Sequence, residues 1–177
     1  MLQVGDKAPP FALVDQRGKK VSLKHFAKRK VLVYFYPKAD TPGCTEQSCL
    51  LSGISKEIGR TAIVGISPDA PAKQLKFDIK YDLGFPLLAD ETHSVAKAYK
   101  VWKKKSMYGR EYMGIERSAF LIDGNGKILF AWYKISPKDT PKFLLEALGK
   151  WRCIPHPNWC CLTEHRFCSS TSSTKSS

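Results

Sequence analysis

The sequence lacks a hydrophobic run long enough to cross a bilayer, and it lacks a recognisable secretory signal. Its longest uninterrupted apolar stretches, such as VLVYFY at 31–36, are far shorter than the about 20 residues of a membrane-spanning helix. The opening MLQVGDKAPPF has no basic start followed by an apolar stretch. The 177 residues, 43% hydrophobic and 25% charged, suffice for one domain with a sizeable core. These features predict an unprocessed, cytoplasmic globular protein.

Long runs of one charge are also lacking, although the net charge is +13. The basic residues are dispersed, and no uninterrupted basic run exceeds three residues, as at 28–30 and 103–105. Nucleic-acid-binding segments usually carry longer basic runs. We therefore expect a solvated basic surface, with 103–105 in a solvated loop, and no specific nucleic-acid or membrane partner.

The six cysteines include no C-x-x-C pair, which argues against the common zinc and thioredoxin spacings. Four of them follow residue 150, where helix and strand periodicity stops and the chain ends in a Ser/Thr/Lys run. We expect a folded domain at 1–150 and a disordered tail at 151–177. Together with His156 and His165 the tail could ligate zinc, but its spacing matches no established pattern, so no metal is expected. Disulfide formation, lipid attachment or no role at all stay open for Cys153, Cys160, Cys161 and Cys168.

Strand and helix patterns alternate along the domain. The turn DGNG at 123–126 lies between the last two strands and predicts an antiparallel hairpin. The runs at 31–37 and 61–67 are nearly continuously apolar, as in strands covered on both faces. This order predicts an α/β fold with a mixed sheet. Strands are expected at 11–15, 20–23, 31–37, 61–67, 85–90, 118–123 and 128–133, and helices at 43–59, 70–82, 92–100 and 137–149.

The stretch ADTPGCTEQSC, residues 39–49, predicts a reactive cysteine. Thr41 has the character of a helix N-cap, and Pro42 suits the first helical position. Cys44 then lies in the first turn, where unpaired N–H groups and the helix dipole favour a thiolate. Gly43 leaves room for a small oxygen-bearing substrate to approach the backbone. An inert buried thiol is the alternative interpretation.

Cys49 lies five residues further along the same predicted helix. Five residues of helix rise by about 7.5 Å, whereas a disulfide needs its two Cα atoms within about 7 Å. A Cys44–Cys49 bond therefore requires the helix to unwind partly. This geometry favours a disulfide that forms and breaks during turnover rather than a permanent structural disulfide.

The segment P37-K-A-D-T41-P-G-C44 resembles the P-x-x-x-T-x-x-C motif of the peroxiredoxins. The second cysteine, five residues on, is similar to that of the bacterioferritin comigratory protein subfamily, also called peroxiredoxin Q. The opening at 4–13 and the segments 64–69 and 101–128 resemble the same subfamily. The resemblance implies a thioredoxin-like fold, with a mixed central sheet flanked by helices and an N-terminal β-hairpin extension. It also implies a thiol-dependent peroxidase without metal, haem or flavin.

The resemblance assigns a role to each motif residue. Cys44 would be the peroxidatic cysteine and Cys49 the resolving cysteine. Thr41 would hydrogen-bond the thiolate and the peroxide, Pro37 would shield the pocket from water, and Arg117 would bring its guanidinium to the sulfur and the peroxide oxygens. Gly43, Thr41 and Arg117 would then form the substrate-binding group.

The implied cycle reduces hydrogen peroxide or organic hydroperoxides through a sulfenic acid on Cys44 and a Cys44–Cys49 disulfide. Thioredoxin or a similar dithiol would reduce that disulfide. The preferred peroxide stays open, and a monomer is expected with a dimer as the alternative. Two rival functions stay open: a thioredoxin-type oxidoreductase, which expects C-x-x-C, and a basic nucleic-acid-binding or zinc-binding module.

Five other side chains have weaker signals. His25 and His93 are expected at the surface or at helix ends. Trp102, Tyr108 and Tyr112 are expected to pack around or near the rim of the active site.

Overall fold

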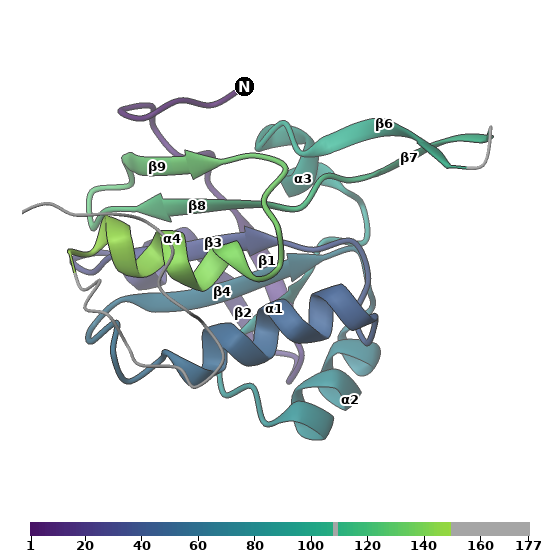
Figure 1. Ribbon diagram of the computed structural model, residues 1–177, viewed down its shortest axis with the longest axis horizontal. Coiled ribbons are helices and arrows are strands. Elements are labelled where there is room, and N and C mark those ends of the chain that lie inside the picture. Colours follow the sequence, from purple (N-terminus) through teal and green to yellow (C-terminus); the bar gives the residue numbers. More distant parts are fainter. Residues whose placement is uncertain (108–109, 150–177) are drawn as a thin grey trace, which may run out of the picture.

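A seven-stranded mixed sheet organises the computed structural model, which describes residues 1–107 and 110–149 (Figure 1). The strand order is β2-β1-β5-β4-β3-β8-β9, and β6 and β7 form a separate two-stranded ribbon. The α/β fold with a mixed sheet is therefore confirmed. The strands are β1 (Ala12–Asp15), β2 (Lys20–Ser22), β3 (Val31–Phe35), β4 (Ala62–Ser67), β5 (Leu87–Ala89), β6 (Trp102–Met107), β7 (Arg110–Ile115), β8 (Ser118–Ile122) and β9 (Ile128–Trp132).

The centre of the sheet is parallel and its flanks are antiparallel. Strand β3 pairs parallel with β4, and β4 pairs parallel with β5. The hairpin of β8 and β9 joins β3 on one side, and the hairpin of β1 and β2 joins β5 on the other. All residues of β3 are buried, which agrees with its continuous apolar sequence. The predicted N-terminal hairpin and the DGNG hairpin are both confirmed.

Helices cover both faces of the sheet (Figure 1). One buried cluster joins α1, α2 and α4 to one face, with Leu51, Phe77 and Leu144 among its residues. The other buried cluster joins α3 and the short 3₁₀ helix η1 to the opposite face, with Val95 and Phe26 among its residues. The helices are η1 (Leu23–Phe26), α1 (Pro42–Gly53), α2 (Pro71–Tyr81), α3 (Ser94–Ala98) and α4 (Asp139–Ala147). Across residues 1–107 and 110–149, no helix is long and apolar enough to span a membrane.

Two local predictions are wrong. Residues 103–105 lie in β6 and not in a loop. Consecutive lysines of this strand face opposite sides, and each contacts a carboxylate or carbonyl oxygen of the segment that follows. Helix α1 ends at Gly53 and is followed by turns up to residue 60, so the predicted helix over 43–59 is too long.

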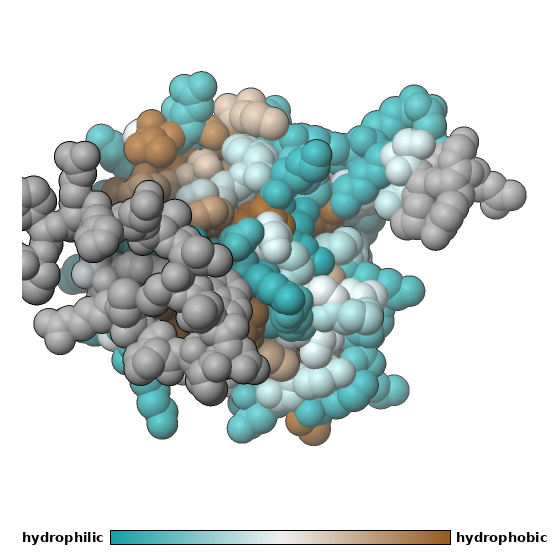
Figure 2. All heavy atoms as spheres, viewed as in Figure 1, coloured by the Kyte–Doolittle hydropathy of each residue, from teal (hydrophilic) through white to brown (hydrophobic). Residues whose placement is uncertain are grey.

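The ribbon of β6 and β7 projects from the body of the molecule and is largely hydrophilic in the space-filling view (Figure 2). The tail 151–177 lies outside the described residues, and its domain boundary stays a prediction.

The register of β3 and β8 positions the site. Phe35, at the end of β3, pairs with Ser118, at the start of β8. The chain leaving β3 toward α1 and the residue preceding β8, Arg117, therefore meet at the same edge of the sheet. This pairing brings together residues that are 73 positions apart in the sequence.

Gly65 in β4 is a test of how closely the sheet and its covering side chains pack. A Cβ atom at this position would lie 2.9 Å from Leu87 Cδ2 and 2.9 Å from the Tyr34 hydroxyl oxygen. Gly65→Ala should therefore lower the free energy of unfolding by about 1–3 kcal/mol, measured by urea denaturation. Gly53→Ala is the matched control, because a Cβ atom added there would meet nothing within 4 Å, and we expect it to be neutral or slightly stabilising. Equal stability of the two variants would contradict this account.

Candidate active site

Cys44 lies in the first turn of α1, beside the sheet. Thr41 is the N-cap with extended backbone, φ −105° and ψ 150°, and Pro42 begins the helix, as predicted. The Cys44 side chain is fully buried, with 0% exposure. The N–H groups of Gly43 and Cys44 belong to the first turn, where an α-helix supplies them with no carbonyl partner. The helix start therefore presents donors and a positive dipole end around the sulfur.

The Thr41 hydroxyl has a different partner from the one expected. Its Oγ1 donates to the carbonyl oxygen of Lys38 at 3.0 Å, and it makes no side-chain capping bond to the helix. The hydroxyl has one proton, so in this state it cannot also donate to a peroxide. Rotation about the Cβ–Oγ1 bond, which breaks the bond to Lys38, would be needed to redirect that proton.

Arg117 contacts the sulfur directly. Its Nη2 lies 3.3 Å from Cys44 Sγ, and its Nη1 lies 2.5 Å from Gln47 Oε1 and 3.4 Å from the Gly43 carbonyl oxygen. Arg117 directly precedes β8, as predicted, and its side chain reaches across to α1. A guanidinium is charged at all working pH values, and it stabilises a neighbouring thiolate.

Gln47 is a site residue that the motif did not reveal. It is fully buried, and its Nε2 donates to Thr140 Oγ1 at 2.8 Å while its Oε1 accepts from Arg117. Thr140 Oγ1 in turn donates to the Ser136 carbonyl oxygen at 3.1 Å. The chain of bonds links the guanidinium to the start of α4. The available sequence signal was the spacing, since Gln47 lies three residues after Cys44 and so on the same helix face.

Gly43 lies beneath the guanidinium. A Cβ atom there would lie 3.4 Å from Arg117 Nη2 and 3.4 Å from Pro137 Cγ. The missing side chain keeps this space open beside Cys44. Pro37, also part of the motif, is partly buried and follows the fully buried Tyr36 at the end of the strand.

Cys49 shares α1 with Cys44 but has a different environment. Both cysteines are free thiols, and Cys49 is partly buried against the cluster under α1. Burial raises the pKa of the Cys49 thiol. Between them, Ser48 Oγ lies 2.8 Å from the Tyr34 hydroxyl oxygen, which ties the helix to the sheet. The two cysteines are thus separated by intact helix.

The loop from β3 to α1 is held by two carboxylates. Asp69 Oδ2 accepts the Ala39 N–H at 2.6 Å. Asp40, which has a φ of 60°, accepts from Lys80 Nζ at 2.9 Å and from the Tyr81 hydroxyl at 2.9 Å. Helix α2 therefore anchors the segment that leads into Cys44. The hydrogen bonds from Lys80 and then Tyr81 lower the pKa of Asp40, and the bond to Asp40 raises the pKa of Lys80.

The weaker sequence signals resolve differently. His93 is the N-cap of α3, as expected of a helix-end histidine, and its ring centroid lies 3.9 Å from that of Trp102. His25 lies in η1, where its Nδ1 accepts from the Ser22 N–H at 2.9 Å. Tyr112 lines a cavity that also borders Arg117, whereas Trp102 packs on the core of the other face. Tyr108 lies outside the described residues.

No group of three or more His, Cys, Asp or Glu side chains in residues 1–107 and 110–149 could hold a metal ion. The cysteines and histidines of the tail lie outside these residues.

Comparison with known proteins identifies the family. The AhpC/TSA family model matches residues 4–131. The chain belongs to the AhpC/TSA family. This AhpC/TSA chain is similar to the putative peroxiredoxin Bcp of Haemophilus influenzae, 46% identical over 149 residues that span 83% of this chain and 96% of the relative. Peroxiredoxin Bcp of Escherichia coli is 49% identical over 129 residues, 72% of this chain and 83% of that one.

Solved structures of AhpC/TSA peroxiredoxins share the fold. Peroxidoxin BcpB from Mycobacterium tuberculosis superposes with a TM-score of 0.75 at 33% identity, covering 86% of this chain and 99% of that chain. A Xanthomonas campestris bacterioferritin comigratory protein, studied for its alkyl peroxide reduction activity, gives a TM-score of 0.74 at 32% identity, covering 78% and 90%. The expected membership of the Bcp peroxiredoxins, and with it the thioredoxin-like fold, is confirmed.

The contact between Arg117 and Cys44 predicts a difference in thiol reactivity. Arg117→Met should slow alkylation of Cys44 by iodoacetamide at neutral pH by about tenfold, because a charge-assisted hydrogen bond to the thiolate is lost. Peptide mass mapping reads Cys44 separately from the other cysteines. Arg60→Met is the control, since this exposed arginine lies in the turns beyond the far end of α1. Equal rates in wild type and Arg117→Met would show that the guanidinium does not stabilise the thiolate.

The Asp40 contacts predict a pH-dependent restraint on the start of α1. A carboxyl with a lowered folded pKa stabilises the folded state at neutral pH and loses this contribution as the pH falls through that value. Asp40→Asn should raise amide hydrogen exchange at 38–45 by less than about fivefold at neutral pH, because the ion pair is exposed. The difference in exchange rate between Asp40→Asn and wild type should shrink as the pH is lowered through the acid range. A difference that grows on acidification would contradict this role of the Asp40 carboxylate. The exposed Glu91→Gln serves as control.

Proposed function

We propose that this chain reduces hydroperoxides at Cys44, with Cys49 as the resolving cysteine. The observation that carries the proposal is the contact of 3.3 Å between Arg117 Nη2 and Cys44 Sγ at the start of α1. A fixed cation and first-turn N–H groups converge on one buried sulfur there. This arrangement suits a thiolate nucleophile and an oxygen that gains negative charge as it leaves.

In the first step, the Cys44 thiolate attacks the terminal oxygen of the hydroperoxide. The S–O bond forms as the O–O bond breaks, and the leaving oxygen takes up a proton to give water or an alcohol. Cys44 is oxidised to a sulfenic acid, and the peroxide is reduced by two electrons. Arg117 stabilises the charge that develops on the two oxygens, and Gln47 fixes the direction in which the guanidinium points.

The motif residues around the sulfur have supporting roles. Gly43 leaves the space in which the peroxide approaches, because a Cβ atom there would crowd Arg117. Thr41 would rotate its hydroxyl from the Lys38 carbonyl toward the bound peroxide. Pro37 would limit the access of water to the pocket.

In the second step, α1 frays and Cys49 attacks the sulfenic sulfur. An S–S bond forms, the S–O bond breaks, and the hydroxyl leaves as water with the proton of the Cys49 thiol. Fraying breaks the bond between Ser48 and Tyr34 and exposes Cys49, whose thiolate is disfavoured while the helix is folded. The resolving thiol is therefore less reactive until the first step has taken place.

An external dithiol then restores both cysteines by thiol–disulfide exchange. We propose thioredoxin or a similar protein dithiol for this role, acting on a monomer in the cytoplasm. A single chain supplies both sulfurs, so the cycle needs no second subunit. Hydrogen peroxide and organic hydroperoxides are the proposed substrates.

The function is tested by mapping the oxidised protein. One equivalent of hydrogen peroxide should produce a disulfide between Cys44 and Cys49, identified by peptide mass spectrometry. Cys44→Ser should abolish peroxide consumption. Cys49→Ser should still consume one equivalent and leave a sulfenic acid that a dimedone probe labels, because the first step needs only Cys44.

A joint serine replacement of the tail cysteines is the matched control and should leave turnover unchanged. A disulfide from Cys44 to a tail cysteine would instead overturn the assignment of Cys49. Undiminished peroxide consumption by Cys44→Ser would overturn the proposed function as a whole. The tail cysteines are Cys153, Cys160, Cys161 and Cys168.

A further inference from the structure

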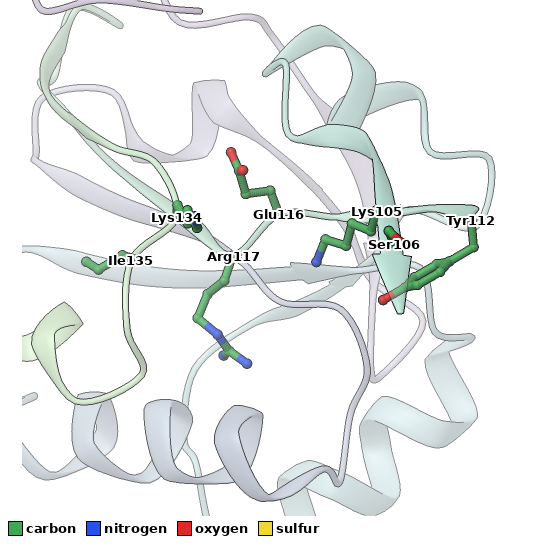
Figure 3. A pocket seen from close by; sticks show the side chains of 7 residues that line it. All are labelled: Lys105, Ser106, Tyr112, Glu116, Arg117, Lys134 and Ile135. Carbon is green, nitrogen blue, oxygen red and sulfur yellow. The ribbon is translucent and has the colours of Figure 1, made fainter. Parts of the chain in front are cut away.

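A cavity of about 420 Å³ opens beside Arg117, on the side where the β6–β7 ribbon leaves the body (Figure 3). Its volume is more than ten times the roughly 30 Å³ that a water molecule occupies in the liquid. Hydrogen peroxide is only slightly larger than water, so the cavity exceeds what that substrate needs. Seven residues line it: Lys105, Ser106, Tyr112, Glu116, Arg117, Lys134 and Ile135.

Positive charge predominates in the lining. The lining holds three cations, Lys105, Arg117 and Lys134, and one carboxylate, Glu116. That carboxylate is already paired, because its Oε1 lies 2.6 Å from Lys103 Nζ. In Figure 3 the Glu116 side chain points away from the Arg117 guanidinium, which extends in the opposite direction toward α1. The residues that line the cavity therefore carry a net positive charge, which Glu116 offsets only in part.

Lys105 is the cation whose setting is most informative. Its Nζ donates to the carbonyl oxygen of Ile115 at 2.5 Å, a partner that carries no net charge. Burial lowers the pKa of Lys105, and the nearby Arg117 guanidinium lowers it further, whereas Glu116 and Cys44 raise it. Burial is thus the main unfavourable effect on this ammonium, and Glu116, the carboxylate beside it, is shared with Lys103. A bound anion would offset part of what the ammonium loses on burial.

Lys134 completes the cationic set from the opposite wall. It is exposed, has a φ of 53°, and directly precedes Ile135, whose N–H donates to the Arg117 carbonyl oxygen at 3.0 Å. No ion pair joins Lys134 to another residue within 1–107 and 110–149. This backbone bond holds the main chain of residue 135 against that of Arg117, so that Lys134 and Arg117 line the same cavity.

We propose that this cavity is a subsite for the negatively charged group of an organic hydroperoxide, with Lys105 and Lys134 as its anchoring cations. The inference rests on the proposed function, because the peroxide end of the same molecule must reach Cys44 past Arg117. The favoured substrate class is an organic hydroperoxide that carries a carboxylate on the body of the molecule. Tyr112 and Ile135 supply apolar surface for that body.

The subsite is tested with a matched pair of substrates, the para-carboxylate of cumene hydroperoxide and its methyl ester. The two share the reacting group and the ring and differ in charge. For wild type, kcat/KM should be about fivefold higher for the carboxylate at low salt, and the ratio should fall toward one as salt screens the lysines. Lys134→Gln and Lys105→Gln should each lower the ratio, and Lys134→Glu should bring it below one.

Lys104→Gln is the control variant. It removes the same charge from the neighbouring position of β6, where the lysine faces the other side and pairs with Glu111 at 2.5 Å. The control should leave both kcat/KM values and their ratio unchanged. A ratio of one in wild type, or an equal fall of the ratio in Lys104→Gln and Lys134→Gln, overturns the subsite.

The two proposals fail in distinguishable ways. Consumption of hydrogen peroxide that depends on Cys44, together with a carboxylate-to-ester ratio of one, rejects the subsite and leaves the peroxidase function standing. No consumption of any of the three peroxides rejects both. Binding can also be read without turnover, because unreactive para-isopropylbenzoate should inhibit hydrogen peroxide reduction competitively in wild type and more weakly in Lys134→Gln.

Discussion

The contact between the Arg117 guanidinium, just before β8, and the Cys44 sulfur, at the start of α1, is the constraint on which the site depends. It exists because Phe35 pairs with Ser118, which brings the end of β3 and the start of β8 to one edge of the sheet. A shift of this register by one residue would turn the side chains of β8 to the opposite face. The buried strands therefore serve chemistry as well as stability, since their packing fixes where the positive charge lies.

Helix α1 and the loop before it must stay folded while Cys44 reacts with the peroxide. The start of the helix must then unfold locally so that Cys49 can reach Cys44. Gln47 and Ser48 hold α1 to α4 and to the sheet, and Asp40 and Asp69 hold the preceding loop. Each of these bonds is an individual polar contact, although Tyr34 and Ala39 also belong to the apolar cluster under α1. The start of the helix can therefore open while the β-sheet and its cores persist, which places the flexible part of the molecule at the cysteines.

Much of this arrangement could be predicted from the sequence. The apolar runs of β3 and β4, the DGNG turn and the T-P-G lead-in to Cys44 carry strong local signals, and Arg117 was placed correctly before a strand. The ribbon of β6 and β7 could not be predicted, because the three consecutive lysines at 103–105 show no alternation of polar and apolar residues. Their partners lie across the ribbon and are not visible in the local sequence. Gln47 was missed because a buried amide has no local pattern, and its role depends on Thr140, which is 93 positions away. The direction of the Thr41 hydroxyl is a rotamer choice that no sequence pattern specifies.

The ribbon of β6 and β7 has a further consequence for how the molecule could be altered. It contributes Lys105 and Tyr112 to the cavity, whereas the hydrogen bonds described above that hold Gln47, Ser48 and the loop of Asp40 come from other elements. The ribbon residues that would contact the body of a substrate and the residues that position the Cys44 sulfur are thus in separate parts of the chain. Exchanging the ribbon while the sheet edge and α1 are kept should therefore change the substrate selectivity separately from the reactivity of Cys44.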